Sequence, residues 1–486
     1  MEKRKIIILV LLALAVNLSA KIKLPAIVSS NMVLQRNTTV KLWGWADANE
    51  KITVELSWLD KSLNVTTDKN GKWSISVNTT NSKEPQSIRL KSKESDITLE
   101  NILFGEVWLC SGQSNMYQPL EGYKGQPVYG YLETVVRANN SNLRLFTVNN
   151  VGSKTPLPDV KKYIAWQEAS PANVPAFSAV AYYFGKQLQE ILDVPVGLIH
   201  SSWGGSNVQA WISKEVLNKF ENVNIDSVDI SYKTNRISTA LFNAMINPLI
   251  PYTIKGVLWY QGEANRKEPE KYKKLFPAMV KDWRTRWDIG NFPFLYVQIA
   301  PYFYGGRDLH KIYNDPYYNS AFIREVQQQC VELIPNSAMA VTLDIGKEYC
   351  IHPPQKKEVA DRLLYKALNK VYGFSAVECD APVFKSLEAK DGGLVVKFDN
   401  IKRGLFSYTE LTGFEIAGKD HVFYPAKAKI INRHLELFVE SKKVTNPVAV
   451  RYAWRNYIKG TLFGGNLLPV SSFRTDNWDD AVLYKK

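Results

Sequence analysis

Five short apolar runs in the middle of this 486-residue chain constrain its fold more than any other feature. Each run is short enough to be one buried strand, and apolar residues recur at helical spacing in the segments between them. Strands that alternate with helices predict βαβ units and a mostly parallel sheet covered on both faces. The runs are Val107–Cys110, Val196–Ile199, Val257–Tyr260, Phe294–Ile299 and Met339–Leu343.

The flanking regions have the period-two alternation of half-buried strands instead. Before the apolar runs, residues 40–45 and 52–56 alternate, and Asn70-Gly71 between two strand-like segments predicts a tight hairpin of residues 65–67 with 73–77. After the runs, three further strand-like segments follow from residue 393 onward. We therefore predict a β domain at 21–101, an α/β domain at 102–375 and a second β domain at 376–486.

The first 20 residues are predicted to be a signal peptide. A basic start at Lys3, Arg4 and Lys5 precedes an apolar core, and the small residues Ser19 and Ala20 suit cleavage. The apolar core, residues 6–16, is short for a membrane span of about 20 residues, so we expect no span after cleavage. The alternative is a retained N-terminal anchor. We expect the mature protein to be exported, either to a periplasm or out of the cell.

Charge and cysteine content exclude several classes of protein. The chain carries 61 Lys and Arg against 47 Asp and Glu, but the basic residues are scattered, which predicts a solvated surface and no nucleic-acid partner. Four cysteines are too few for a disulfide scaffold, and their three possible pairings stay open. Cys110 ends an apolar run, so we expect a buried free thiol. No spacing indicates zinc, so no metal or cofactor is expected, and the oligomeric state is unknown.

Polar or titratable residues directly follow four of the five apolar runs. In open α/β sheets, ligands bind at the carboxyl ends of the strands, so these residues are expected to meet at one edge. Each string alone is a weak signal, and their convergence indicates a functional site. The strings are 111–116, 200–206, 261–265, and 344–346 with 352–353.

Ser114 is the candidate nucleophile, and it requires a base because a free hydroxyl is scarcely ionised at neutral pH. The chain has five histidines. Of these, His352 follows the last run, and the prolines after it hold the chain extended. His352 is therefore the predicted base, and His200 is the competing assignment. A purely structural histidine is the other interpretation of His352.

The strings at the strand ends resemble the SGNH hydrolases, and within them the sialate O-acetylesterase family of carbohydrate esterases. The resemblance covers nearly the whole chain, because further matches lie in both flanking regions. The matching segments are 32–36, 43–46, 105–116, 201–205, 259–265, 344–346, 351–353, 448–454 and 473–476.

The resemblance implies a flavodoxin-like SGNH hydrolase core between two β-sandwich-like domains, and removal of acetyl groups from acetylated sugars or glycans without a metal. Ser114 would attack the acetyl carbonyl and His352 would take its proton. The oxyanion would be held by the backbone N–H of Ser114, a backbone N–H of Gly204 or Gly205, and a side-chain amide. Gln261 would supply that amide, or Asn265 would; the alternative role of Asn265 is to cap a loop.

One departure from the family pattern concerns the acid that orients the histidine. The family commonly has Asp two residues before the His, and other SGNH enzymes have it three before; here Cys350 and Tyr349 stand there. Asp344 and Glu348 are the candidate replacements, and a backbone carbonyl that leaves a Ser–His dyad is the third option. A non-catalytic glycan-binding relative also stays open. The resemblance implies 9-O-acetyl sialic acid as the substrate, and an acetylated plant glycan is the alternative.

Overall fold

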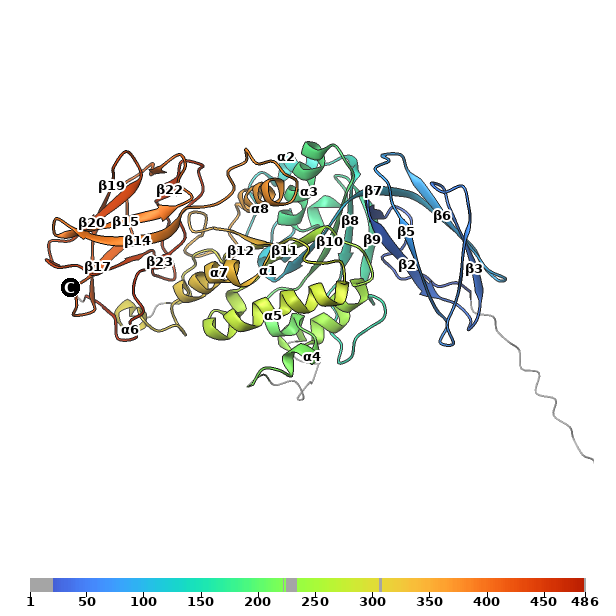
Figure 1. Ribbon diagram of the computed structural model, residues 1–486, viewed down its shortest axis with the longest axis horizontal. Helices are drawn as coiled ribbons and strands as arrows, with labels where there is room; N and C mark the ends of the chain where they lie inside the picture. Colours follow the sequence, from blue (N-terminus) through green and yellow to red (C-terminus); the bar gives the residue numbers. More distant parts are fainter. Residues whose placement is uncertain (1–20, 222, 224–233, 306–307, 485–486) are drawn as a thin grey trace, which may run out of the picture.

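The computed structural model describes residues 21–221, 223, 234–305 and 308–484. The predicted signal peptide, residues 1–20, lies outside the described residues. The chain forms three parts in a row, with the N-terminal strands at the right of Figure 1, a helix-rich α/β part in the middle and the C-terminal strands at the left. No helix in the described ranges is both long and apolar enough to cross a membrane.

The sheet of the middle part has a separate strand at each of the five predicted runs, although β12 and β13 end before their runs do. Its order is β13-β12-β11-β7-β10-β8-β9. The pairings from β13 to β8 are parallel, and β9 is antiparallel to β8. The strands are β7 (Asp96–Gly112), β8 (Asn140–Val148), β9 (Tyr163–Ala169), β10 (Val196–Ser202), β11 (Gly256–Tyr260), β12 (Phe294–Val297) and β13 (Ser337–Ala340).

The α/β architecture agrees with the prediction, but the sheet as a whole is mixed. The reason is that β7 is 17 residues long and its first half pairs antiparallel with β6 (Gln86–Lys91) of the N-terminal part. One strand thus runs through the predicted boundary at 101/102, and the domain boundaries stay predictions. Without β8 and β9, the order β10-β7-β11-β12-β13 is the 2-1-3-4-5 order of flavodoxin-like sheets.

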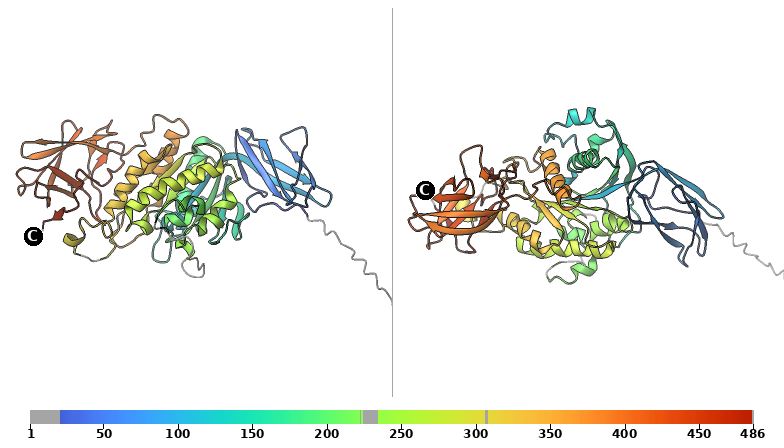
Figure 2. Two further views of the ribbon diagram at one scale, coloured as in Figure 1. Left: turned by 60° about the horizontal axis from the view of Figure 1, so that its bottom comes forward. Right: turned by 45° about the horizontal axis from the view of Figure 1, so that its top comes forward.

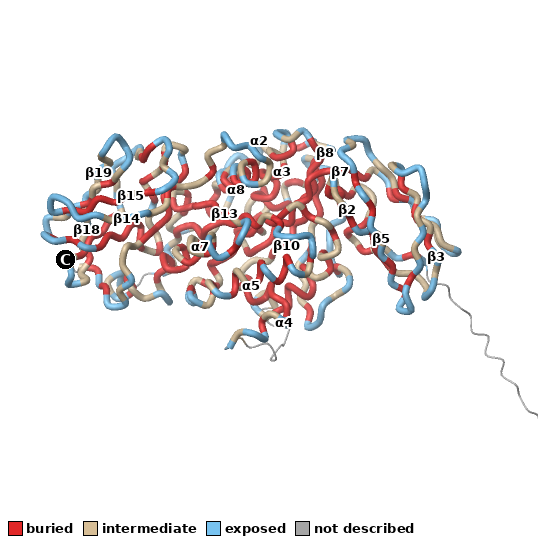
Figure 3. Tube along the Cα trace, in the orientation of Figure 1, coloured by how far each residue is buried: buried red, intermediate tan, exposed pale blue. Residues whose placement is uncertain are grey.

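Helices cover both faces of this sheet, as Figures 1 and 2 show. Helices α3 (Ala179–Leu192) and α8 (Lys356–Lys370) pack on one face, and α5 (Pro269–Trp287) and α7 (Ala321–Leu333) on the other. Alternate strand residues point to the two sides: Trp108 packs with the α3–α8 cluster, whereas Leu109 packs with the other one. The buried segments therefore run through the centre of the molecule (Figure 3), which explains the near-continuous apolar runs in the sequence.

Short helices complete the middle part and its loops. They are α1 (Ser114–Tyr117), α2 (Tyr131–Val136), α4 (Lys214–Leu217), α6 (Leu309–Ile312), η1 (Val174–Ala176), η2 (Val208–Trp211), η3 (Thr234–Arg236), η4 (Phe242–Ile246), η5 (Asn247–Leu249) and η6 (Glu263–Asn265). Two of them, α1 and η6, follow the carboxyl ends of strands β7 and β11, where the sequence predicts the functional site.

The N-terminal part consists of strands, as predicted, but the expected hairpin does not form. The chain does turn at Asp68–Gly71, where the N–H of Gly71 donates to the carbonyl of Asp68 at 2.9 Å. However, β4 (Leu63–Thr66) pairs with β3 (Lys51–Leu56), and β5 (Lys72–Asn78) pairs with β2 (Thr39–Trp45). The turn carries the chain from one sheet to another, so that both sheets bury apolar faces. A local turn signal cannot distinguish these two outcomes. The remaining strand, β1 (Val33–Gln35), lies parallel to β7.

The C-terminal part is also built of strands. A four-stranded sheet has the order β14-β15-β20-β19, a five-stranded sheet has the order β23-β21-β17-β18-β24, and β16 pairs with β22. The strands are β14 (Val383–Lys390), β15 (Gly393–Asp399), β16 (Leu405–Phe406), β17 (Phe414–Ala417), β18 (Val422–Pro425), β19 (Lys427–Ile431), β20 (Glu436–Glu440), β21 (Ala449–Tyr452), β22 (Phe463–Gly464), β23 (Phe473–Arg474) and β24 (Val482–Leu483).

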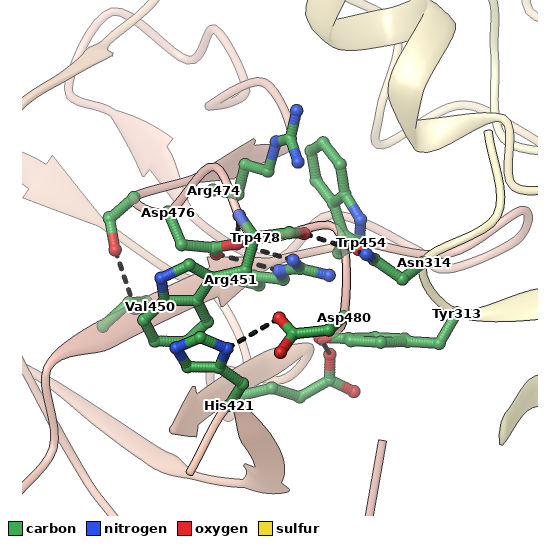
Figure 4. Close-up of polar contacts among 12 residues, drawn as sticks. Tyr313, Asn314, His421, Val450, Arg451, Trp454, Arg474, Asp476, Trp478 and Asp480 are labelled. Carbon is green, nitrogen blue, oxygen red and sulfur yellow. Dashed lines mark hydrogen bonds and ion pairs between the residues drawn. The ribbon is translucent and has the colours of Figure 1, made fainter. Parts of the chain in front are cut away.

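Buried polar contacts attach the C-terminal part to the middle part (Figure 4). Arg451 on β21 is fully buried and makes two hydrogen bonds to the carboxylate of Asp476, at 2.9 and 2.6 Å. Its guanidinium also lies 5.0 Å from the ring centre of Tyr313, which belongs to the segment after α6. The amide of Asn314 in the same segment donates to the carbonyl of Trp478 at 2.8 Å. The two parts therefore pack as one unit.

Candidate active site

Ser114 stands on a sharp turn between a strand and a helix. Strand β7 ends at Gly112 and α1 begins at Ser114, which is partly exposed. Gly112 has a φ of 136°, and a Cβ on it would lie 2.2 Å from the carbonyl oxygen of Tyr260. Only glycine fits at this point. The turn therefore presents the Ser114 hydroxyl at the carboxyl edge of the sheet, as the sequence predicts.

Gln113 fixes this turn to the end of β11. Its backbone N–H donates to the carbonyl of Tyr260 at 2.9 Å. Its side-chain Oε1 accepts from the backbone N–H groups of Gly262 and Ala264, at 3.4 and 3.2 Å. Two neighbouring strand ends are thus held together directly beneath Ser114.

His352 lies beside this turn because two contacts hold its segment there. The amide of Asn115 donates to the carbonyl of Ile351 at 3.1 Å. The hydroxyl of Tyr123 donates to the carbonyl of Ser114 at 3.2 Å, and the ring of Tyr123 meets that of His352 edge-on, with 5.1 Å between centres. The segments that carry Ser114 and His352, 238 positions apart in the numbering, are therefore side by side. Burial, reinforced by Lys356, lowers the pKa of His352 to about 4.

The Nδ1 atom of His352 contacts a glutamine where a triad would have a carboxylate. Nδ1 lies 2.6 Å from Oε1 of Gln126. The thiol of Cys350 is 3.8 Å from the same Oε1 and donates to the carbonyl of His352 at 3.1 Å. Sequence reasoning missed Gln126, because it lies in the loop between α1 and α2 and not at a strand end. No signal in the sequence singles it out.

Both carboxylates that were candidate replacements for the orienting acid are engaged elsewhere, and neither hydrogen-bonds to the His352 ring among the described residues. Asp344 forms a bidentate ion pair with Arg362 of α8, at 2.8 and 2.7 Å. Glu348 makes its side-chain hydrogen bond with the exposed Tyr349. Both distances to Arg362 are those of strong, charge-assisted hydrogen bonds. A buried arginine next to Asp344 is therefore the physical reason for its absence from the site.

The loop after β10 places Gly204 against the nucleophile. A Cβ on Gly204 would lie 3.5 Å from Cβ of Ser114. The carbonyl of Gly204 accepts from the amide of Asn235 at 2.6 Å, so the N–H of Gly205 in the same planar peptide points the opposite way. Within the described residues, the N–H groups of Ser114, Gly204 and Gly205 donate to no backbone acceptor. These three groups are available to hold an oxyanion.

The two candidate amide donors are both engaged in hydrogen bonds within the protein. Gln261 is fully buried, and its two N–H groups are taken by the carbonyl of Ser206 at 3.2 Å and by Oδ1 of Asn265 at 2.8 Å. Asn265 is also buried; its Oδ1 accepts from the N–H of Val208 at 2.8 Å, and its amide donates to Gln209 at 2.9 Å. Gln261 therefore has no free N–H for an oxyanion. Asn265 matches its alternative role and braces the loop that carries Gly204.

The competing base, His200, is a buried structural residue. Its Nε2 lies 2.6 Å from the hydroxyl of Ser202, and its ring packs against Tyr117 and Phe177. It is 3% exposed, and burial lowers its pKa to about 4. The other three histidines, His310, His421 and His434, contact residues of the C-terminal part. Cys110 is a buried free thiol as expected, and all four cysteines are free.

A buried charged network beneath the site was also missed by sequence reasoning. Nζ of Lys356 donates to Oδ1 of Asn115 at 2.6 Å, and the amide of Asn115 donates to Glu263 at 2.7 Å. Burial lowers the pKa of Lys356 to about 7 and raises that of Glu263. A single lysine in the first turn of an amphipathic helix normally indicates a solvated position. Nothing local in the sequence predicts this one to be buried.

This arrangement has the parts that acyl transfer requires. A hydroxyl on a strand–helix turn, an imidazole on an adjacent loop and backbone N–H groups without a partner among the described residues are groups that can supply a nucleophile, a base and an oxyanion site. A family model described as carbohydrate esterase, sialic acid-specific acetylesterase, matches residues 105–358, which is more than half of the chain. The chain belongs to the sialic acid-specific acetylesterase family. It is therefore a carbohydrate esterase, a hydrolase of carboxylic esters.

Individual members of the sialic acid-specific acetylesterase family extend the match over most of the chain. The mouse and human sialate O-acetylesterases are 26% and 28% identical to it, and each alignment covers 88% of this chain, with 89% of the mouse and 87% of the human protein. The crystal structure of a carbohydrate acetylesterase from Xanthomonas citri is 34% identical and superimposes with a TM-score of 0.84. That superposition covers 94% of this chain and 100% of the other.

Proposed function

We propose that the protein hydrolyses the 9-O-acetyl ester of sialic acid, with Ser114 as nucleophile and His352 as base. The observation that carries this proposal is that Tyr123 hydrogen-bonds to Ser114 and packs on His352, while Gly204 lies so near that a Cβ on it would touch Ser114. This geometry supports a nucleophile, an oxyanion site and a base within one small volume. The family match supports an acetylated sugar as the substrate.

The proposed reaction has two steps. In the first, the Ser114 oxygen attacks the acetyl carbonyl while Nε2 of His352 takes the hydroxyl proton. The N–H groups of Ser114, Gly204 and Gly205 hold the oxyanion, and each such donor can be worth about 3 kcal/mol at the transition state. The intermediate collapses, the sugar oxygen leaves with the proton from His352, and Ser114 carries the acetyl group. In the second step, His352 takes a proton from water as the water oxygen attacks the acetyl-serine. The intermediate collapses, the Ser114 oxygen leaves with the proton from His352, and the acetic acid that is released ionises to acetate.

A basic, aromatic recess next to η6 supports an acidic sugar as the substrate. Arg266 lies over the ring of Tyr304 at 4.3 Å, and Lys267 lies over that of Tyr317 at 4.0 Å. These four residues line a cavity of about 120 Å³. Sialic acid carries a carboxylate, which an arginine can bind through two parallel hydrogen bonds. A neutral acetylated plant glycan has no such group.

The nucleophile is tested by Ser114→Ala with 4-nitrophenyl acetate as substrate. We expect turnover to fall to background, because the change removes the attacking oxygen and no core volume. Ser202→Ala, which removes a hydroxyl at the neighbouring strand end, is the matched control and should remain active. Hydrolysis by purified Ser114→Ala at the rate of the unchanged protein would remove Ser114 from the mechanism.

The substrate is tested by comparing 9-O-acetyl sialic acid with an acetylated neutral sugar. Arg266→Gln should raise KM for the sialic acid ester by about tenfold or more, the usual effect of losing a hydrogen bond to a charged group. Its KM for 4-nitrophenyl acetate should not change. Lys274→Gln, at an exposed position on the nearby helix α5, is the control. Preference of the unchanged protein for the neutral sugar would support the plant-glycan alternative instead.

A further inference from the structure

We propose that Gln126 takes the place of the missing carboxylate as the positioning residue of His352, so that the ester is hydrolysed by a triad whose third member is uncharged. The inference rests on the proposed function, because it describes how the base of that reaction is oriented. Gln126 hydrogen-bonds to Nδ1 of His352. The other ring nitrogen, Nε2, is the one that takes the serine proton.

The contact with Gln126 decides the tautomer of His352. The distance of 2.6 Å between Nδ1 and Oε1 of Gln126 is that of a strong hydrogen bond. An amide oxygen only accepts, so Nδ1 must carry the proton. In a neutral imidazole the other nitrogen, Nε2, then has a free lone pair and can act as a base. An amide oxygen has this role in the Cys-His-Asn triads of papain-like proteases, so a charge is not essential.

Gln126 lies next to the position of the family's usual acid. Residue 350 stands two positions before His352, where the family commonly has Asp, and here it is Cys. The Cys350 thiol lies 3.8 Å from Oε1 of Gln126. The side chain of residue 350 thus lies next to the glutamine oxygen that contacts the ring. With Asp344 paired to Arg362, Gln126 is the only described residue with a hydrogen bond to the His352 ring.

The loop between α1 and α2 holds Gln126 rigidly. Its backbone N–H donates to the carbonyl of Tyr123 at 2.8 Å, and its carbonyl accepts from the N–H of Tyr123 at 3.0 Å and from the side-chain amide of Gln118 at 3.0 Å. Gly122 has a φ of 82°, and a Cβ there would lie 2.4 Å from the carbonyl oxygen of Gln126. A residue locked in this way can fix the orientation of the ring before substrate binds. Tyr123, the partner of Gln126 across this turn, also packs on the His352 ring.

The neutral partner has a consequence for the charge of His352 during catalysis. When the ring takes the serine proton, no carboxylate stabilises the imidazolium. The ionisable groups that face the ring region are Tyr123 from its loop, Cys350 from its own segment, and Lys356 from α8, with Glu263 behind Asn115. Of these, Lys356 acts to lower the pKa of His352. A carboxylate at position 126 would act in the opposite direction.

Two substitutions separate a positioning role from a merely structural one. Gln126→Ala should lower kcat by about tenfold or more with little change in KM, because the ring loses the hydrogen bond that fixes its tautomer. Gln126→Glu should keep the turnover at neutral pH and move the acid limb of kcat/KM upward by about one pH unit or more. Lys124→Glu, exposed on the same loop, is the control for added negative charge and should leave the acid limb in place.

The tautomer is tested independently of activity by selective 15N labelling of the five histidines. The His352 signal, assigned by its loss in His352→Gln, should be that of an Nδ1-protonated neutral ring at pH 7. An Nε2-protonated ring would overturn the proposal, and so would unchanged kcat in Gln126→Ala or an unmoved acid limb in Gln126→Glu. If the unchanged protein instead hydrolyses no acetyl ester while the Nδ1 proton is found, the proposed function fails and the positioning by Gln126 stands.

Discussion

Nζ of Lys356 lies 2.6 Å from Oδ1 of Asn115, so an ammonium group buried at the start of α8 holds the residue that follows Ser114. Lys356 is 1% exposed. The other end of the same amide reaches Glu263 at 2.7 Å and the carbonyl of Ile351 at 3.1 Å. One asparagine therefore joins the segments that carry the nucleophile, the base and the loop after β11. The charge beneath the site also acts on the base.

Replacing Lys356 should change the pH dependence of the enzyme. Burial first, and Lys356 second, lower the pKa of His352 to about 4. A base works when deprotonated, so the acid limb of kcat/KM should lie near that value, well below the ordinary value of about 6.5. Lys356→Met removes the repulsion, so the limb should move to higher pH and activity at pH 5 should fall relative to pH 8. Lys357→Met, at the exposed neighbouring position, is the control, and an unmoved limb in Lys356→Met would contradict the expectation.

Loss of His352 should lower turnover, whereas loss of His200 should lower stability. His352→Ala should reduce turnover to about the level of Ser114→Ala, since nucleophile and base act as a unit. His200→Ala should retain turnover but lower stability by about 1–3 kcal/mol, because it leaves a cavity and an unpaired Ser202 hydroxyl. Steady-state kinetics and thermal unfolding measure the two effects. Full activity in His352→Ala would remove His352 from the mechanism.

The carboxylates near His352 in sequence should not be needed for turnover. Asp344→Asn and Glu348→Gln should each lower kcat less than about tenfold, whereas loss of a true triad acid costs about four orders of magnitude. Asp344→Asn should also lower the free energy of unfolding, because the buried Arg362 loses its ion-pair partner. Denaturant unfolding checks this. A loss of several hundredfold in kcat, with the fold intact, would return either carboxylate to the mechanism.

Restoring an acid at position 350 should increase turnover or leave it unchanged. Cys350→Asp places a carboxylate where the thiol now lies, 3.8 Å from the oxygen that contacts Nδ1 of His352. The negative charge should raise the pKa of His352 and so move the acid limb of kcat/KM upward. Cys350→Ser is the neutral control of similar size and should leave the limb unchanged. The same pH profile in both variants would show that residue 350 does not reach the ring.

The ion pair between Arg451 and Asp476, where the C-terminal part attaches, should contribute to the stability of the protein and not to its turnover. Asp476→Asn leaves the fully buried Arg451 guanidinium without its carboxylate, which typically costs about 3–5 kcal/mol. Thermal unfolding should show a lower midpoint, with kcat at 25 °C close to that of the unchanged protein. Asp479→Asn, exposed three residues further on, is the control. Equal midpoints for the two variants would contradict this role.

The sequence by itself determined the α/β core and most of the residues at its edge. Runs such as Val257–Tyr260 are apolar because strands between two helical layers are buried on both faces. Such burial is visible in the local sequence as a continuous apolar segment. The strand ends follow from the same pattern, so Ser114, Gly204 and His352 could be placed at one edge from sequence alone. The hairpin at Asn70-Gly71 could not be decided in this way, because a turn signal does not say which sheet the next strand joins.

Only the tertiary structure decided what surrounds the reacting groups. Gln126, Asn115 and Lys356 come from a loop, a helix end and another helix, and each has its role through a partner far away in the chain. Asp344 looked suitable by its distance in sequence, yet Arg362 on α8 binds it. Gln261 looked like a free amide, yet Asn265 and Ser206 occupy both of its N–H groups. Hydrogen bonds form between groups that are close in space, and for loop residues closeness in space has no periodic signature in the sequence.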